Sequence, residues 1–249
     1  MAMNEAVGLP VSAAQKRRLF ERKAVLFVLG LLVLATLAGF GPTYYFKLQT
    51  ALSEYRLITT IHAAAMGAWI AVFALQIYLV RRKMIGLHMK LGMAAVGLAL
   101  LIIIVGYLTA VEAAKFGMNA APAGIPPLSF LIVPLVDIVL FAIFFGAALF
   151  YRKKPAIHKR MMLLTAFNFM PAAVARVPIG SLQSLGPVWF FGFPDLVLLI
   201  LIGVDTWRNR RLEPAFALGA LLLIASHPLR LAVMESEPWL AAARWMTGG

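Results

Sequence analysis

Seven long apolar runs, separated by short polar junctions, constrain the fold of this chain more than any other feature. They cover residues 24–41, 57–80, 89–110, 128–150, 159–178, 188–206 and 214–234. About 20 apolar residues in a helix cross the roughly 30 Å hydrocarbon core of a bilayer. Hydrophobic residues make up 62% of the chain and charged residues only 13%, which lies outside the range of soluble globular domains. We therefore expect an all-α, polytopic membrane helix bundle with seven transmembrane helices.

Lys and Arg are distributed unevenly between the two ends of these runs. The N-terminal arm and the second, fourth and sixth junctions hold 17 of the 23 basic residues. Because retained cations mark the cytoplasmic side, this pattern predicts a cytoplasmic N-terminus and an outer C-terminus. The net charge of +13 follows from the same placement. It therefore indicates anionic lipid headgroups as partners rather than nucleic acid.

The chain is expected to form a single membrane domain over residues 1–249. A basic cytoplasmic arm covers 1–23, the seven-span bundle covers 24–234, and a tail covers 235–249. The arm is too long and too charged for the start of a signal peptide, so the first run should be retained as a helix. The tail carries Trp239 and Trp245 and is expected to form a short helix in the outer interface.

The absence of cysteine excludes several chemistries at once. A chain with no Cys has no disulfide, no iron–sulfur cluster and no covalently attached haem. The sequence also lacks a Walker A loop, a dinucleotide-binding glycine fingerprint and a G-x-S-x-G elbow. These absences argue against nucleotide-driven transport by this chain and leave catalytic residues unassigned.

Two junctions repeat one pattern, in which three basic residues precede a histidine. The first runs from Arg81 to His88 and the second from Arg152 to His158. This repeat places two imidazoles at the same depth near the cytoplasmic side, where they could ligate a haem b from opposite faces. The alternative is that both are ordinary interfacial residues.

Basic and small residues near this pair fit either interpretation. Arg82, Lys90 and Arg160 could neutralise haem propionates, yet the positive-inside rule predicts cations there without a haem. The stripe Gly92, Ala95 and Ala99 after His88 leaves room for a flat macrocycle or for close packing of another helix.

A second set of polar residues lies inside the runs, toward the predicted outer side. His62 and His227 share one depth, and the set also contains Asp137, Asp195, Asn168 and Arg176. Ionisable groups at the bilayer centre cost at least about 2.5 kcal/mol and so normally face a partner or a cavity. His62 and His227 could hold a second haem or a metal ion. With Asp137 and Asp195 they could instead form a proton relay, or each histidine could simply hydrogen-bond a neighbouring helix.

Residues 57–178 carry a resemblance. The stretch from His62 through Trp69, Phe73 and Gln76 to Leu87-His88 and Leu91-Gly92 resembles paired helices of the transmembrane cytochrome b561 family. The same stretch, with the later motif Ile157-His158-Lys159-Arg160-Met161, is similar to a bacterial multi-span membrane family of unassigned function. The resemblance implies that His62 and His88 match haem-ligand positions of the cytochromes. The fourth run departs from that family because it offers Asp137 and no histidine.

These features predict a b-type cytochrome-like protein of the bacterial inner membrane that transfers single electrons through a bis-histidine haem. Quinol or a membrane redox protein would supply the electrons, and the oligomeric state is left open. A different class also fits the sequence. A non-redox transporter of protons or metal ions, an assembly factor or an accessory subunit would use His62, Asp137, Asp195 and His227 as a polar cluster.

Overall fold

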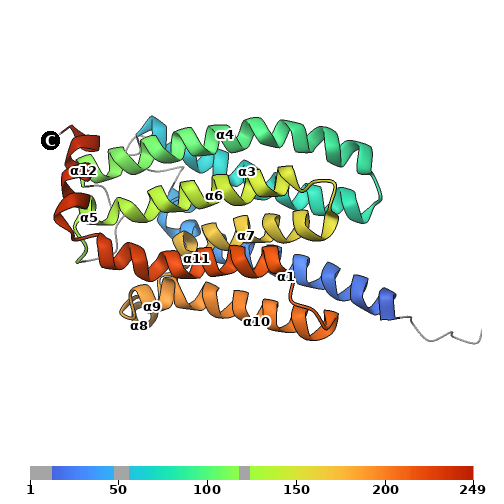
Figure 1. Cartoon of the computed structure of the whole chain (residues 1–249). Coiled ribbons are helices and arrows are strands. Elements are labelled where there is room, and N and C mark those ends of the chain that lie inside the picture. Colours follow the sequence, from blue (N-terminus) through green and yellow to red (C-terminus); the bar gives the residue numbers. More distant parts are fainter. Residues whose placement is uncertain (1–12, 48–55, 118–123, 249) are drawn as a thin grey trace, which may run out of the picture.

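A computed structural model describes residues 13–47, 56–117 and 124–248 of the chain. Within these ranges every regular element is helical. The elements are α1 (Ala13–Thr43), the 3₁₀ turn η1 (Tyr45–Lys47), α3 (Leu57–Arg81), α4 (Ile85–Phe116), α5 (Pro127–Phe130), α6 (Ile132–Phe150), α7 (Pro155–Val174), α8 (Gly180–Gln183), α9 (Pro187–Phe190), α10 (Gly192–Asn209), α11 (Pro214–Val233) and α12 (Glu237–Thr247). The seven long helices lie side by side as a bundle (Figure 1).

Proline and glycine explain many of the helix boundaries. Five helices, namely α5, α7, α9, α11 and α12, carry Pro in their first turn, where its fixed φ suits a helix start and its missing N–H is not needed. Helix α4 ends at Gly117, whose φ of 63° is the left-handed conformation that glycine adopts without strain.

Six segments are long and apolar enough to cross a membrane. They are Arg22–Lys47, Leu57–Arg81, Ile85–Phe116, Pro127–Phe150, Pro187–Asn209 and Pro214–Val233. The chain is therefore a helical bundle of the integral membrane type. The run predicted at 159–178 does form a helix, but this helix, α7, begins four residues earlier and ends at Val174. It is not among the six, so the expectation of seven spans is confirmed only in part.

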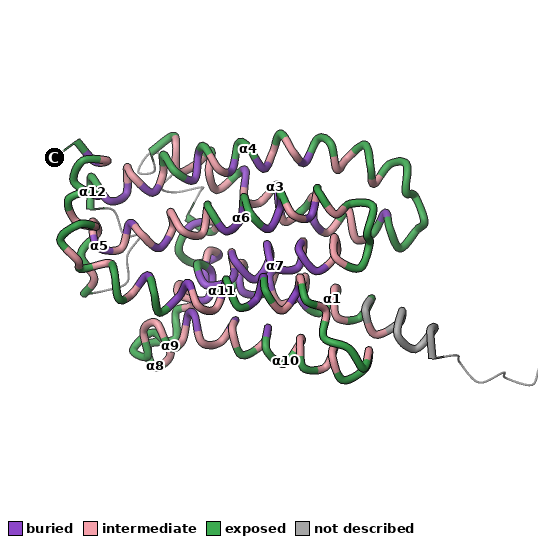
Figure 2. The backbone as a smooth tube through the Cα atoms, viewed as in Figure 1, coloured by how far each residue is buried: buried purple, intermediate pink, exposed green. Residues whose placement is uncertain are grey.

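Helix α7 is the central helix of the bundle. It packs against α1, α6, α10 and α11, and Figure 2 shows it as the most continuously buried of the long helices. Its buried residues include Arg160 and Asn168 as well as its apolar side chains. Because other helices surround α7, its polar residues meet protein rather than lipid. This position explains how α7 can carry buried Arg and Asn side chains.

Two glycines allow the helices around α7 to approach closely. A Cβ placed on Gly39 of α1 would lie 3.3 Å from the Arg176 Cβ and in direct clash with the backbone oxygen of Ala173. A Cβ on Gly219 of α11 would clash with the Leu164 side chain. Glycine at both positions therefore lets α1 and α11 pack directly onto α7 and its C-terminal end.

The interior between α3, α4, α6 and α7 is filled by aromatic side chains. The Trp69 ring meets Phe141 and Phe145 edge-on, at centroid distances of 5.0 and 5.3 Å, and Phe141 lies 4.8 Å from Phe169. Such edge-to-face contacts stabilise packed aromatic cores. The middle of this four-helix group is therefore a packed core.

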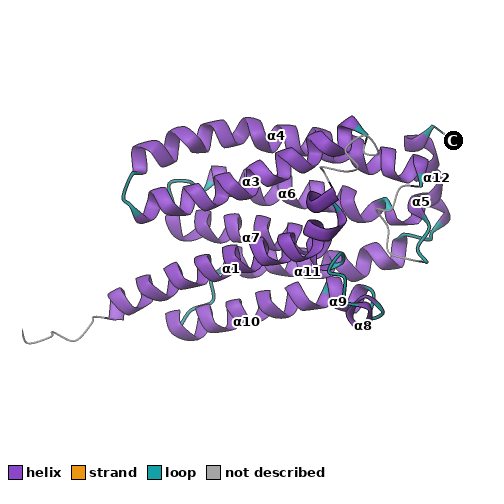
Figure 3. Ribbon diagram, turned by 180° about the vertical axis from the view of Figure 1, so that it is seen from behind, coloured by secondary structure: helices purple, strands orange, loops and turns teal. Residues whose placement is uncertain are grey.

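The turns that carry basic residues lie together at one end of the bundle. The α3–α4, α6–α7 and α10–α11 connections gather at the end where α1 begins, while α5, α8, α9 and α12 lie at the other (Figure 1). The view from behind shows the same division (Figure 3). We call these the basic end and the C-terminal end of the bundle.

The predicted short helix in the tail is confirmed as α12. The Trp239 indole N–H donates to the carbonyl oxygens of Leu128 and Ser129, at 3.2 and 3.3 Å, and Ala243 is fully buried. These contacts fix α12 across the C-terminal end against α4 and α5. Residues 1–12 of the predicted N-terminal arm lie outside the described residues.

Candidate functional site

His88 and His158 come together at the basic end of the bundle. His88 lies in the first turn of α4 and His158 in the first turn of α7. Their ring centroids are 6.3 Å apart and their planes are nearly perpendicular, at 88°. The predicted juxtaposition of these two imidazoles is therefore present. We call these residues the histidine pair.

The Nδ1 atoms of the two rings in the histidine pair differ in their hydrogen bonding. The His158 Nδ1 lies 2.8 Å from the backbone oxygen of Ala148. A carbonyl oxygen can only accept, so this Nδ1 carries the hydrogen and Nε2 keeps its lone pair. The Nδ1 of His88 is buried without a hydrogen-bond partner. Both rings thus retain hydrogen-bonding or ligating capacity that the described contacts do not use.

The small residues after His88 serve helix packing. Ala95 and Ala99 are buried, and Ala99 packs in one cluster with Trp69 of α3 and Phe141 of α6. The space beside Gly92 faces the Gln76 amide, whose nitrogen lies 3.6 Å from where a Cβ would stand. That amide donates to the His88 backbone oxygen at 3.2 Å. The stripe that could have held a macrocycle is therefore covered by packed side chains, and the case for a ligand rests on the two rings.

Arg160 is fully engaged elsewhere. Its guanidinium makes two-point contact with the Asp205 carboxylate, with the shortest N–O distance at 2.7 Å, and also donates to the Ala156 oxygen. The Arg160 side chain is 3% exposed and that of Asp205 is 11% exposed. Asn209 donates a further hydrogen bond to Asp205. Arg160 thus joins α7 to α10, whereas Arg82 and Lys90 remain exposed near the histidine pair.

A second polar group lies near the C-terminal end of the bundle. Arg230 donates to the Asp137 carboxylate, to the Val133 oxygen at 3.2 Å and to the Ser226 hydroxyl at 2.8 Å. Asn168 donates to the Asp137 backbone oxygen at 2.9 Å. The buried guanidinium thus connects α11 to α6, and Asn168 connects α7 to α6.

His227 extends this polar group to α10. Its Nδ1 lies 2.9 Å from the Asp195 carboxylate, and its ring stacks on Phe191 at 4.1 Å with an angle of 13°. The Arg230 guanidinium lies 5.6 Å from the same Phe191 ring. We call Asp137, Asn168, Asp195, Ser226, His227 and Arg230 the Arg230 network. Each of these polar side chains has a hydrogen-bonding partner inside the bundle, as expected for polar residues within membrane-type helices.

Three atoms of the Arg230 network are buried without a partner. They are the Asn168 Oδ1, the His227 Nε2 and the Arg230 Nε. Buried polar atoms normally find a partner, and an internal water often supplies it. The network therefore has capacity for water or a small polar species.

The predicted pairing of His62 with His227 does not occur among the described contacts. His62 faces Gly106 of α4, because a Cβ placed on Gly106 would lie 3.7 Å from the His62 Cε1 and would also contact Ile138 of α6. The His62 Nδ1 is buried without a partner. Among the described residues, no hydrogen bond, ion pair or ring contact joins His62 to His227. The two histidines share a predicted depth but contact different helices.

Arg176, expected in the same polar cluster, lies just beyond the end of α7. Its guanidinium donates to the Ala172 oxygen at 2.7 Å and lies 4.8 Å above the Phe40 ring of α1. No group of three or more His, Asp or Glu side chains in the described ranges is arranged to hold a metal ion. The four-residue cluster of His62, Asp137, Asp195 and His227 is therefore not assembled as a metal site there.

Three residues of these sites were not predicted as site residues from the sequence. Asp205 was missed, although an acid within an apolar run and level with Arg160 could have indicated the pair. Ser226 and Arg230 lie one helical turn apart, which is the spacing at which side chains on one helix face meet. Comparison with known protein families, with curated proteins and with solved structures gave no match in any of the three. Fold and site together define a class, a helical bundle of the membrane type with a histidine pair at one end and a buried ionic network near the other.

Proposed function

We propose that this protein is a membrane b-type cytochrome in which His88 and His158 would hold the iron of one haem. The observation that carries the proposal is the 6.3 Å distance between the two ring centroids. Nitrogen ligands lie about 2.0–2.1 Å from a metal, and an imidazole centroid lies about 1.1 Å behind its nitrogen. Two opposed imidazoles on one metal therefore have centroids about 6 Å apart.

Residues around the histidine pair support this ligation. The Ala148 carbonyl accepts from His158 Nδ1, which is the usual outer contact of a metal-bound histidine and fixes the ring orientation. The unpartnered Nδ1 of His88 leaves that ring with unused capacity. Lys90, which is exposed, can pair with a propionate. A haem with two histidine ligands supplies a one-electron iron couple.

We also propose a membrane topology, an electron donor and a number of haems. Helix α7, buried among its neighbours, serves as the seventh span, so that the N-terminus is cytoplasmic and the C-terminus lies outside. Quinol or a membrane redox protein of a bacterial inner membrane is the electron donor. One haem is proposed rather than two, because His227 is already bonded to Asp195 and stacked on Phe191.

The test is a spectrum of the purified protein. We expect Soret and α bands of b-type haem in the dithionite-reduced minus oxidised spectrum and one haem per chain by pyridine haemochrome. His88→Ala and His158→Ala should each remove the bands, while the matched variant His62→Ala should retain them. A colourless protein that takes up no added haemin would overturn the proposal. A non-haem metal that both variants lose would keep the two ligands but overturn the haem.

A second candidate function rests on the Arg230 network. Its three unpartnered buried atoms, flanked by two carboxylates and a histidine, favour bound water and proton transfer. In proteoliposomes with an imposed pH gradient, the wild-type protein should then conduct protons and His227→Phe should not. Equal conductance of wild-type and protein-free vesicles would exclude this candidate, whatever the spectrum of the protein shows.

A further inference from the structure

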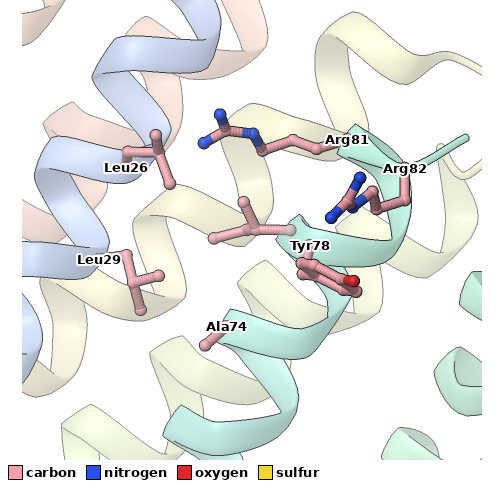
Figure 4. Close-up of a pocket in the computed structure, with 7 residues that line it drawn as sticks. Leu26, Leu29, Ala74, Tyr78, Arg81 and Arg82 are labelled. Carbon is pink, nitrogen blue, oxygen red and sulfur yellow. The ribbon is translucent and has the colours of Figure 1, made fainter.

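An open groove lies between α1 and α3 at the basic end of the bundle. Its volume is about 440 Å³, and seven residues line it: Leu26, Leu29, Ala74, Ile77, Tyr78, Arg81 and Arg82. Figure 4 shows Leu26 and Leu29 on one helix across from Ala74 on the other, with both arginines at one end. The groove is therefore apolar along its length and cationic at one end.

The packing of α1 explains why this groove is open. Helix α1 packs mainly against α7 and only lightly against α3. Ala74 contributes little volume on the α3 side, and Leu26 on the α1 side is 37% exposed. Both helices belong to segments apolar enough to cross a membrane. The apolar part of the groove thus faces the hydrocarbon region, and the arginines lie where α3 ends.

The two arginines have no acidic partner in the described part of the chain. Its ion pairs involve Arg56, Arg160, Arg230, Arg244 and His227. The Arg82 guanidinium lies 5.4 Å from the Tyr78 ring centroid, which positions it beside the groove. Guanidinium groups bind phosphate through two parallel hydrogen bonds. A pair of unneutralised guanidinium groups at the end of an apolar groove therefore suits a phosphate that carries a hydrocarbon chain.

We propose that this groove binds an anionic phospholipid, with its phosphate on Arg81 and Arg82 and one acyl chain along Leu26, Leu29, Ala74 and Ile77. The volume of the groove lies within the range of about 300–1,000 Å³ typical of ligand sites. The apolar wall gives a soluble phosphate no advantage, and a zwitterionic lipid brings a cation toward the arginines. Anionic lipid satisfies both halves of the site, because each basic residue near a membrane surface adds to the attraction for an anionic headgroup.

Native mass spectrometry of the full chain tests this site. The protein is released from nanodiscs that contain equal amounts of phosphatidylglycerol and phosphatidylcholine, and retained lipid is counted. We expect one phosphatidylglycerol per chain in the wild type. Its retention should fall about tenfold or more in Arg81→Gln/Arg82→Gln. The control Arg152→Gln/Lys153→Gln removes the same charge from the α6–α7 turn and should retain the lipid.

A groove-filling variant and a displacement assay distinguish lipid binding from other outcomes. Ala74→Phe fills the apolar groove without changing charge and should also release the lipid, which keeps the proposal testable if the double arginine variant does not fold. Inorganic phosphate should not displace the bound lipid. Equal retention of both lipids, equal retention in wild type and Ala74→Phe, or displacement by phosphate alone would each overturn the proposal.

Discussion

The histidine pair and the Arg230 network are both polar groups in an apolar bundle, but they differ in how their partners are supplied. In the network, side chains from four helices meet one another, and Arg230 alone bonds Asp137, Ser226 and the Val133 oxygen. In the histidine pair, the two rings lie nearly perpendicular to each other, and Ala148 is the one partner described for a ring nitrogen. The network therefore joins helices, whereas the pair leaves ligating atoms available.

A buried atom without a partner therefore has a different consequence in the Arg230 network than in the histidine pair. In the network, the unpartnered Arg230 Nε and Asn168 Oδ1 belong to groups that already have other partners. In the histidine pair, the unpartnered Nδ1 of His88 belongs to a ring without a described side-chain hydrogen bond. We expect mutations in the network to change stability first and mutations in the pair to change binding first.

Arg230→Leu should have the largest effect on stability. The Arg230 side chain is 1% exposed, and its removal leaves the Asp137 carboxylate buried without its cation. Breaking a buried ion pair in this way destabilises a protein by about 3–5 kcal/mol. Thermal unfolding in detergent measures the change. The double variant Asp137→Leu/Arg230→Leu removes both charges and should recover most of the loss. A double variant as unstable as Arg230→Leu would show that the charges are not the cause.

His227→Phe should have the next largest effect. The new ring can still stack on Phe191, but the Asp195 carboxylate loses the imidazole that lies 2.9 Å away. A buried group left without its hydrogen-bond partner costs about 1–3 kcal/mol. Asp195→Asn, whose amide oxygen can still accept from the imidazole, should be milder in the same unfolding assay. The reverse order of the two variants would contradict this interpretation of the contact.

His158→Phe and His88→Phe should differ slightly from each other. His158→Phe removes the hydrogen bond to the Ala148 oxygen, worth about 0.5–1.5 kcal/mol, whereas His88→Phe removes no described hydrogen bond of its ring. Unfolding of metal-free protein should therefore show a loss only for His158→Phe. Equal losses in both variants would mean that contact between the two rings, rather than the hydrogen bond of His158, stabilises the fold.

His62→Leu should have the smallest effect. The His62 Nδ1 is buried without a partner, and replacing an unsatisfied polar group by an apolar one of similar size is close to neutral or stabilising. We expect a change in unfolding free energy within about 1 kcal/mol. A loss above about 2 kcal/mol would show that His62 has a role in the fold that its described contacts do not reveal.

Much of the fold could be predicted from the sequence, because apolar runs and proline positions are local signals. Each of the seven runs overlaps one long helix, and the tail helix was expected at 235–249 and forms at Glu237–Thr247. Helix α7 is the instructive exception. The polar residues of α7 lower its hydropathy below that of a span that faces lipid. Its burial among four long helices accounts for that composition.

The sequence determined helix positions, the gathering of basic residues at one end and the shared depth of His88 and His158, because these depend on residue order and helical rise. Only the tertiary structure decided which side chains of equal depth meet. The rings of His88 and His158 lie next to each other, whereas His62 and His227 contact different helices, and Arg160 pairs with Asp205. The physical reason is that contact also depends on how each helix is rotated about its axis and on which helices are neighbours, and both are set by packing across the whole bundle.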